Sequence, residues 1–241
     1  MCELLVDTDV LIKLALYGLL DDVMHAGCVA GCTQRTGIIT AAAFVARQRI
    51  GRQAVNASAA NAHLETSLRT IVSLEPTEGE LSLAAEFEAE ANLIGVDLDN
   101  GESQLCAIAL SRGDPIVLTG DKRALVALER LLPRIAELLR LTHRIACLEQ
   151  ALRVIVQRRG AKAVRDSVVA EPTADKATSI CFRATSEVVP DDFDPEGLDS
   201  YIEAIRRDAP SMLISGRQLD LSAVPQKHGE GSEHGCAKPD S

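Results

Sequence analysis

Three carboxylates in this chain have residue types and spacing that could do metal-dependent chemistry. Asp7 comes directly after the apolar run Leu4–Val6, and Asp121 follows the run Ile116–Thr119 after a single glycine. Glu102 lies in the first turn of a helix that we expect between them. Carboxylates that converge repel one another unless a cation neutralises them, and Mg²⁺ or Mn²⁺ suits an all-oxygen site. A water molecule held by such an ion can act as a nucleophile, so hydrolysis is the chemistry that these residues indicate.

Two buried strands are expected to place Asp7 and Asp121 at one edge of a sheet. A continuous apolar run such as Leu4–Val6 fits a strand that is covered on both faces. Ile116–Thr119 is a β-branched apolar run bounded by turn signals, which is typical of a strand. Strands alternate with helices over the first part of the chain, and this order predicts an α/β fold with a parallel sheet flanked by helices. Ligands of such sheets bind at the carboxyl ends of the strands, where both aspartates would lie.

The remaining elements follow from apolar periodicity and capping signals. Thr77-Glu78-Gly79-Glu80 is a capping box, which predicts a helix from there to about Leu93. Further strands are expected over residues 37–40, 70–74 and 145–148. Further helices are expected over residues 10–20, 41–50, 54–68, 102–111, 150–159 and 198–206, and one from residue 122 onwards.

Each candidate acid also has a structural interpretation as a helix cap. Asp9 can accept hydrogen bonds from the first turn of the first helix, which would leave Asp7 without a structural role. Asp99 and Glu102 have the spacing of a capping box, and Asp121 can cap the helix that follows it. The shared strand–acid–helix context nevertheless favours one joint site over three separate caps.

Three motifs in this order resemble those of a PIN domain, a family of metal-dependent ribonucleases that includes VapC-type toxins. They are Val6-Asp7-Thr8-Asp9-Val10-Leu11-Ile12, then Asn100-Gly101-Glu102 opening a helix that runs on to Ala107-Ile108-Ala109, and finally Leu118-Thr119-Gly120-Asp121-Lys122. The resemblance covers roughly residues 3–150. It implies that Asp7, Glu102 and Asp121 bind Mg²⁺ or Mn²⁺ and carry catalysis. It also implies that RNA is the substrate, and it leaves an antitoxin protein and a second copy of the chain open as partners.

Two positions depart from the family's pattern. Many members carry a glutamate on the helix after the second strand, where this chain has Ala41-Ala42-Ala43-Phe44. Many also carry a further aspartate just after the third motif, where this chain has Arg123. Asp9 and Asp99 are the candidates to replace these ligands. If neither does so, the chain is a PIN-like interaction module rather than an enzyme.

A second enzyme class fits part of the same pattern. Asp7-Thr8-Asp9, followed later by Leu118-Thr119, also resembles haloacid-dehalogenase-like phosphatases, in which Asp7 would be the nucleophile. Asp191-Asp192 would then supply the late acid pair. Against this alternative, Val10-Leu11 replaces the usual small turn residues, and Glu102 would have no role.

The charge of the chain is unevenly distributed. Residues 122–165 contain 11 basic and 3 acidic residues, a net charge of +8, whereas residues 166–241 contain 7 and 15, a net charge of −8. A basic segment near an acid cluster suits a polyanionic substrate such as RNA. We expect the acidic segment to compete with RNA for this basic segment, unless it packs as a helix through the apolar positions of 198–206. A further basic cluster is expected to be a solvated surface, namely Arg47, Arg49 and Arg52.

The chain divides by composition into three parts. Residues 1–150 form the predicted PIN-like nuclease domain, and residues 151–217 form a helical and irregular C-terminal extension. Residues 218–241 form a tail that is expected to be disordered, because Gly, Ser, His, Lys and Pro dominate it. No stretch has the ~18 apolar residues that a membrane span needs. The 7 cysteines include no CxxC pair and are odd in number, which favours a reducing cytoplasm over a disulfide framework.

Overall fold

The chain folds around a parallel β-sheet. The computed structural model describes residues 3–24, 35–217 and 219, and within them the sheet has five strands in the order β3-β2-β1-β4-β5, all parallel. The strands are β1 (Leu4–Val6), β2 (Thr36–Ile39), β3 (Val72–Leu74), β4 (Ile116–Thr119) and β5 (Ile145–Cys147). The predicted α/β fold, with a parallel sheet flanked by helices, is confirmed.

The two faces of the sheet are buried in separate hydrophobic clusters. Successive side chains of a strand point to opposite faces, so Leu4 and Val6 enter one cluster and Leu5 enters the other. β4 repeats this alternation, with Leu118 in the first cluster and Val117 in the second. A sheet covered on both faces needs strands that are apolar throughout, and this requirement explains the uninterrupted apolar runs of β1 and β4.

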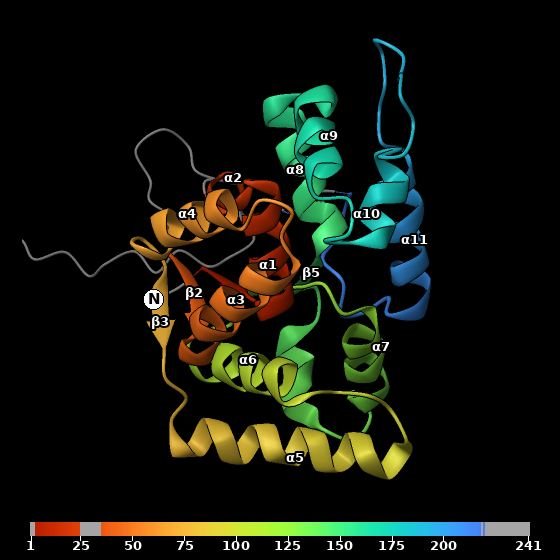
Figure 1. Cartoon of the computed structure of the whole chain (residues 1–241). Helices are drawn as coiled ribbons and strands as arrows, with labels where there is room; N and C mark the ends of the chain where they lie inside the picture. Colours follow the sequence, from red (N-terminus) through yellow and green to blue (C-terminus); the bar gives the residue numbers. More distant parts are fainter. Residues whose placement is uncertain (1–2, 25–34, 218, 220–241) are drawn as a thin grey trace, which may run out of the picture.

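Helices supply the cover on both faces (Figure 1). The first cluster is completed by α1 (Thr8–Tyr17), α2 (Leu20–Met24), α3 (Thr40–Gln53), α4 (Ala57–Leu68), α8 (Leu148–Arg159) and α9 (Ala161–Ala170). The second is completed by α5 (Glu78–Ile94), α6 (Asn100–Ser111), α7 (Lys122–Leu131) and the 3-10 helix η1 (Ala136–Leu141). Two later helices pack against this body, namely α10 (Lys176–Cys181) and α11 (Gly197–Asp208).

The strand order creates a crevice between β1 and β4. The chain runs outward from β1 through β2 to β3, and then returns to the opposite side of β1 to form β4 and β5. The helix after β1 therefore belongs to the first cluster, and the helix after β4 belongs to the second. Loops that leave neighbouring strands toward opposite faces open a crevice at the carboxyl edge, where open α/β sheets bind ligands. Asp7 and Asp121 follow the two strands that border this crevice.

The C-terminal extension packs onto the sheet and its helices. In α11, Leu198 enters the first cluster, and Ile202 and Ile205 enter the second, so the packing alternative for residues 198–206 is confirmed. Leu213 forms an isolated parallel bridge with Ile145 of β5, which covers the edge of that strand. The disorder predicted for 218–241 concerns residues that lie outside the described part of the chain, apart from residue 219.

Several element bounds differ from the predictions for identifiable reasons. α1 ends at Tyr17, earlier than expected, because Gly18 adopts a left-handed conformation with φ of 65°. Gly160, with φ of 85°, ends α8, and the unpredicted α9 begins directly after it. α2, α10 and η1 were not predicted, because helices of 5 or 6 residues are too short to show a readable period.

Among the described residues, no helix is both long and apolar enough to cross a lipid bilayer.

Candidate active site

A pocket lies at the carboxyl ends of β1 and β4, in the crevice described above. Its volume is about 610 Å³. Of the described residues, five carboxylates line it, namely Asp7, Asp9, Asp99, Glu102 and Asp121. All three acids predicted from the sequence are thus brought together, along with the two that were named as replacements for missing ligands. Their role as metal ligands stays a prediction.

Asp7 is a buried carboxylate at the start of α1. It is 5% exposed and is the N-cap of the helix, with its Oδ1 accepting from Thr8 N at 2.6 Å and its Oδ2 from Asp9 N at 3.2 Å. The prediction that Asp9 caps this helix is therefore wrong, and Asp7 has the structural role that we had assigned to its neighbour. Burial, together with the negative charge of Asp9, raises the pKa of Asp7 to about 6. A cation beside this carboxylate would relieve that destabilisation.

Asp9 does not cap the helix and instead forms an ion pair within α1. Its Oδ2 lies 2.6 Å from Lys13 Nζ, one turn further along α1. The backbone of Gly120 approaches this carboxylate closely, since a Cβ added there would stand 2.8 Å from Asp9 Oδ2. Lys13 Nζ also lies 2.7 Å from Asp175 Oδ2, at the N-cap of α10. The position of Asp9 in the pocket therefore depends on the C-terminal extension.

Asp99 and Glu102 enter the pocket from the first turn of α6. Asp99 caps the helix, and its Oδ1 accepts from Gly101 N at 2.9 Å and from Glu102 N at 3.1 Å. Partial burial, opposed by the Gly101 N–H and reinforced by the charge of Asp121, raises the pKa of Asp99. Glu102 is only 7% exposed, and its Oε2 is buried without a hydrogen-bond partner among the described residues. An unpaired buried carboxylate oxygen is costly, so Oε2 of Glu102 is a candidate to bind a ligand.

Asp121 is the N-cap of α7, as the capping interpretation predicted, and it is paired with Arg123. Its Oδ1 accepts from Arg123 N at 2.7 Å, and its Oδ2 accepts from Arg123 Nη2 at 2.9 Å. Partial burial alone would raise the pKa of Asp121, but the hydrogen bonds from Arg123 outweigh it and hold that pKa below its ordinary value. The arginine that departs from the PIN pattern is thus the direct partner of a predicted ligand.

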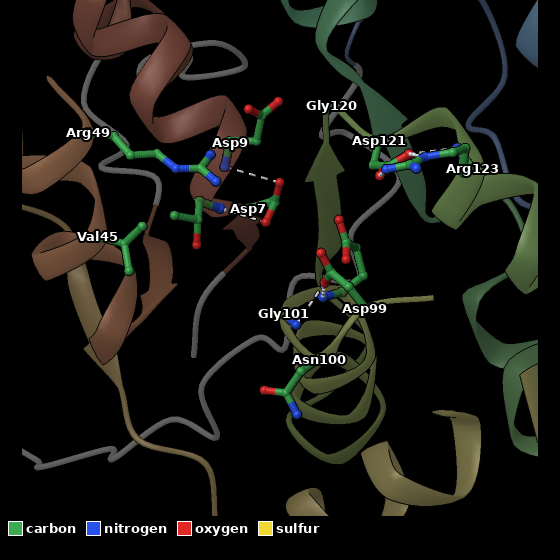
Figure 2. A pocket seen from close by; sticks show the side chains of 12 residues that line it. Asp7, Asp9, Val45, Arg49, Asp99, Asn100, Gly101, Gly120, Asp121 and Arg123 are labelled. Carbon is green, nitrogen blue, oxygen red and sulfur yellow. Dashed lines mark hydrogen bonds and ion pairs between the residues drawn. The ribbon is translucent and has the colours of Figure 1, made fainter. Parts of the chain in front are cut away.

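The helix after the second strand contributes Val45 and Arg49 to the pocket in place of the family's glutamate. Figure 2 shows Arg49 reaching from α3 toward Asp7 and Asp9, while Asp121 and Arg123 lie on the other side of the end of β4. Arg49 is exposed, in agreement with the predicted solvated cluster, but its position in the lining of the pocket was not predicted. Arg47 is also exposed, and its Nε lies 2.6 Å from Oε1 of Glu65. Val45 and Arg49 are four residues apart and so share one helical face, but the sequence does not specify that this face lines the pocket.

The donor types in the pocket fit Mg²⁺ or Mn²⁺, but the side chains are not closed around a common point. Carboxylate oxygens are the ligands that these ions prefer, and the unpaired Oε2 of Glu102 has the expected need for one. Across residues 3–24, 35–217 and 219, no group of three or more His, Cys, Asp or Glu side chains has the geometry to hold a metal ion as it stands. The capping bonds of Asp7 and Asp99 and the Arg123 pair of Asp121 account for this open arrangement, because each directs a carboxylate toward local donors.

The late acid pair of the phosphatase alternative is not part of this pocket. Asp191 is fully exposed on the C-terminal extension and is paired with Lys162 at 2.5 Å. Within the described part of the chain, neither Asp191 nor Asp192 lines the cavity that contains Asp7. Glu102, which would have no role in a phosphatase of that kind, does line it.

Comparison with known proteins identifies no relative of this chain. No protein-family model, no curated protein and no solved structure matches it. The comparison therefore leaves the family open, and any functional assignment depends on the three sequence motifs and on the residues of this pocket.

Proposed function

We propose that this chain is a PIN-type ribonuclease that hydrolyses phosphodiester bonds of RNA with the help of Mg²⁺ or Mn²⁺. The observation that carries the proposal is the buried, unpaired Oε2 of Glu102 in a pocket with four aspartates. Such a cluster is stable only if something positive compensates it. Asp7, Glu102 and Asp121 are the residues that would hold the ion, with Asp9 and Asp99 beside them.

The chemistry divides between the ion and the chain. A bound divalent ion would polarise the phosphate and lower the pKa of a coordinated water. Arg49 and Arg123 line the same pocket and offer guanidinium groups to the non-bridging oxygens of a phosphate. These two arginines supply the positive charge that a polyanionic substrate needs at a site otherwise made of carboxylates.

RNA binding by the basic segment 122–165 finds less support than its net charge indicated. Several of its cations are already paired within the protein: Lys122 with Glu149, Arg134 with Glu90, Arg140 with Asp114, Arg153 with Asp194 and Asp199, Arg159 with Asp22, and Lys162 with Asp191. The acidic extension supplies three of these partners, namely Asp191, Asp194 and Asp199. Arg49 and Arg123, which line the pocket, are therefore better candidates for contact with RNA than the other cations of this segment.

The cellular role follows from the same proposal. A ribonuclease of this kind acts in the cytoplasm, and as a toxin it would be neutralised by an antitoxin protein. A homodimer is part of the same expectation. These partners are proposed from the resemblance of the three motifs alone.

The test is cleavage of single-stranded RNA by the purified chain with Mn²⁺, with and without EDTA. We expect cleavage that EDTA stops and that Asp121→Asn reduces at least tenfold. Glu86→Gln removes an acid from the exposed face of α5, outside the pocket, and should leave cleavage unchanged. The phosphatase alternative would instead be supported if the protein leaves RNA intact and hydrolyses a small phosphomonoester in a reaction that depends on Asp7.

A further inference from the structure

Arg123 uses its side chain to occupy both oxygens of a predicted metal ligand. Its Nε lies 3.3 Å from Asp121 Oδ1, and its Nη2 lies 2.9 Å from Asp121 Oδ2. The backbone N–H of Arg123 separately donates to Oδ1 at 2.7 Å, which is the bond that caps α7. Among the described residues, the 2.9 Å hydrogen bond to Oδ2 comes from the guanidinium of Arg123. Removal of the side chain would thus free Oδ2 and leave the helix cap intact.

The guanidinium is weakly held in this position. The side chain of Arg123 is 73% exposed, and its other ion-pair partner, Asp97, is 81% exposed and lies 3.8 Å away. Ion pairs at such exposed sites contribute little to stability, because water screens them and ordering a long side chain is unfavourable. Arg123 can therefore leave Asp121 without disturbing the core.

We propose that Arg123 is a displaceable counter-ion, which neutralises Asp121 in the metal-free protein and moves to a substrate phosphate when a divalent ion binds. The inference rests on the proposed function, since it assigns Asp121 Oδ2 as the ligand atom. The guanidinium and the ion compete for that oxygen, so the metal affinity of the free protein is lowered by the pair. Once displaced, the same guanidinium stays beside the pocket, where it can pair with a phosphate in a bidentate manner.

Arg49 provides the matched comparison. It lines the same pocket and carries the same charge, but in the described structure no carboxylate accepts a hydrogen bond from it. Arg49→Ala and Arg123→Ala therefore change the electrostatic field of the pocket by one charge each. Only Arg123→Ala also uncovers a ligand oxygen.

The first measurement is calorimetric titration of the full chain with MnCl₂, for wild type, Arg123→Ala and Arg49→Ala. We expect Arg123→Ala to bind Mn²⁺ about two- to fivefold more tightly than Arg49→Ala, as the strength of an exposed ion pair allows. Equal Mn²⁺ affinity in the two variants would overturn the inference and leave the proposed function standing. Failure of wild type and both variants to bind Mn²⁺ would overturn the inference and the proposed function together.

The second measurement follows the guanidinium itself. In a proton–nitrogen correlation spectrum, the Nε–H signal of Arg123, assigned by its loss in Arg123→Lys, should shift toward that of a free arginine as MgCl₂ is added. Arg47 is the internal control, because its exposed pair with Glu65 has the same bidentate geometry but lies outside the pocket. An Arg123 signal that stays fixed while Mg²⁺ binds would show that the pair is permanent and contradict displacement.

Discussion

Lys13 and Asp175 form an ion pair that ties the C-terminal extension to the wall of the acidic pocket. Lys13 Nζ lies 2.7 Å from Asp175 Oδ2 and 2.6 Å from Asp9 Oδ2, and the lysine side chain is only 13% exposed. Burial opposes the charge of Lys13, but its two carboxylate partners outweigh that effect and raise its pKa. The extension is therefore structurally coupled to the acids that we propose for catalysis.

The first prediction is that Asp175→Asn lowers the free energy of unfolding by about 1–3 kcal/mol, because it removes a charged partner of a largely buried lysine. Asparagine can still cap α10 by accepting a hydrogen bond from Thr178 N. The loss of unfolding free energy therefore measures the ion pair between Asp175 and Lys13. Urea unfolding measures it. The control is Asp191→Asn, which breaks the exposed pair with Lys162 and should cause no measurable change. Equal midpoints for wild type and Asp175→Asn would show that the buried pair contributes nothing.

A second prediction concerns pH and Asp7. The folded pKa of Asp7, about 6, lies above its ordinary value of 3.8, so the folded state binds this proton more tightly than the unfolded state. The stability contributed by the protonated form is complete below about pH 4 and is lost as the pH rises through about 6. Asp7→Asn keeps a capping side chain without the charge, and should be more stable than wild type at pH 7 by about 2–3 kcal/mol.

The measurement for Asp7 is urea unfolding of wild type and Asp7→Asn between pH 4 and pH 8 in EDTA. The difference in unfolding free energy should shrink toward zero at the acid end of this range. A difference that does not vary with pH would mean that Asp7 is not the titrating group.

The third prediction concerns the close approach of Gly120 to Asp9. Because an alanine Cβ would stand 2.8 Å from Asp9 Oδ2, Gly120→Ala must displace this carboxylate from Lys13. We expect a loss of about 1 kcal/mol in unfolding free energy, because the ion pair between Asp9 and Lys13 is partly exposed. The loss should largely disappear in an Asp9→Ala background, where the clash is absent. Gly79→Ala in α5 is the control, since its Cβ would meet nothing within 4 Å and alanine favours a helix.

The fold class could be predicted from the sequence because β1 and β4 are largely apolar runs, each followed within two residues by an acid. Alternating strands and helices predict a parallel sheet, which places Asp7 and Asp121 at the same edge. That β1 and β4 are neighbours is a property of the strand order, which was not predicted from the sequence. The choice between Asp7 and Asp9 as the cap could not be made, because it depends on a difference of two residues in the start of α1. Both side chains are good caps, and only the backbone at Asp7 decides between them.

The positions of the pocket arginines could not be predicted from the sequence, for a different reason. Arg49 and Arg47 are two residues apart on one helix, and which of them faces the pocket depends on how α3 packs against the sheet. Arg123 pairs with Asp121 only in some of the rotamers that are open to an exposed arginine, so the sequence does not specify this contact. Side-chain direction at a surface is set by tertiary neighbours, which motifs and periodicity do not specify.

We propose that the pocket acids hold a divalent cation, and the most direct test is calorimetric titration of wild type and Glu102→Gln with MnCl₂. Glutamine keeps the shape of Glu102 and removes only its charge, and the variant's fold can be checked by urea unfolding. We predict that Glu102→Gln binds Mn²⁺ at least tenfold more weakly, which corresponds to a loss of about 1.4 kcal/mol or more. Unchanged Mn²⁺ affinity in a folded Glu102→Gln protein would show that the pocket acids do not hold the ion.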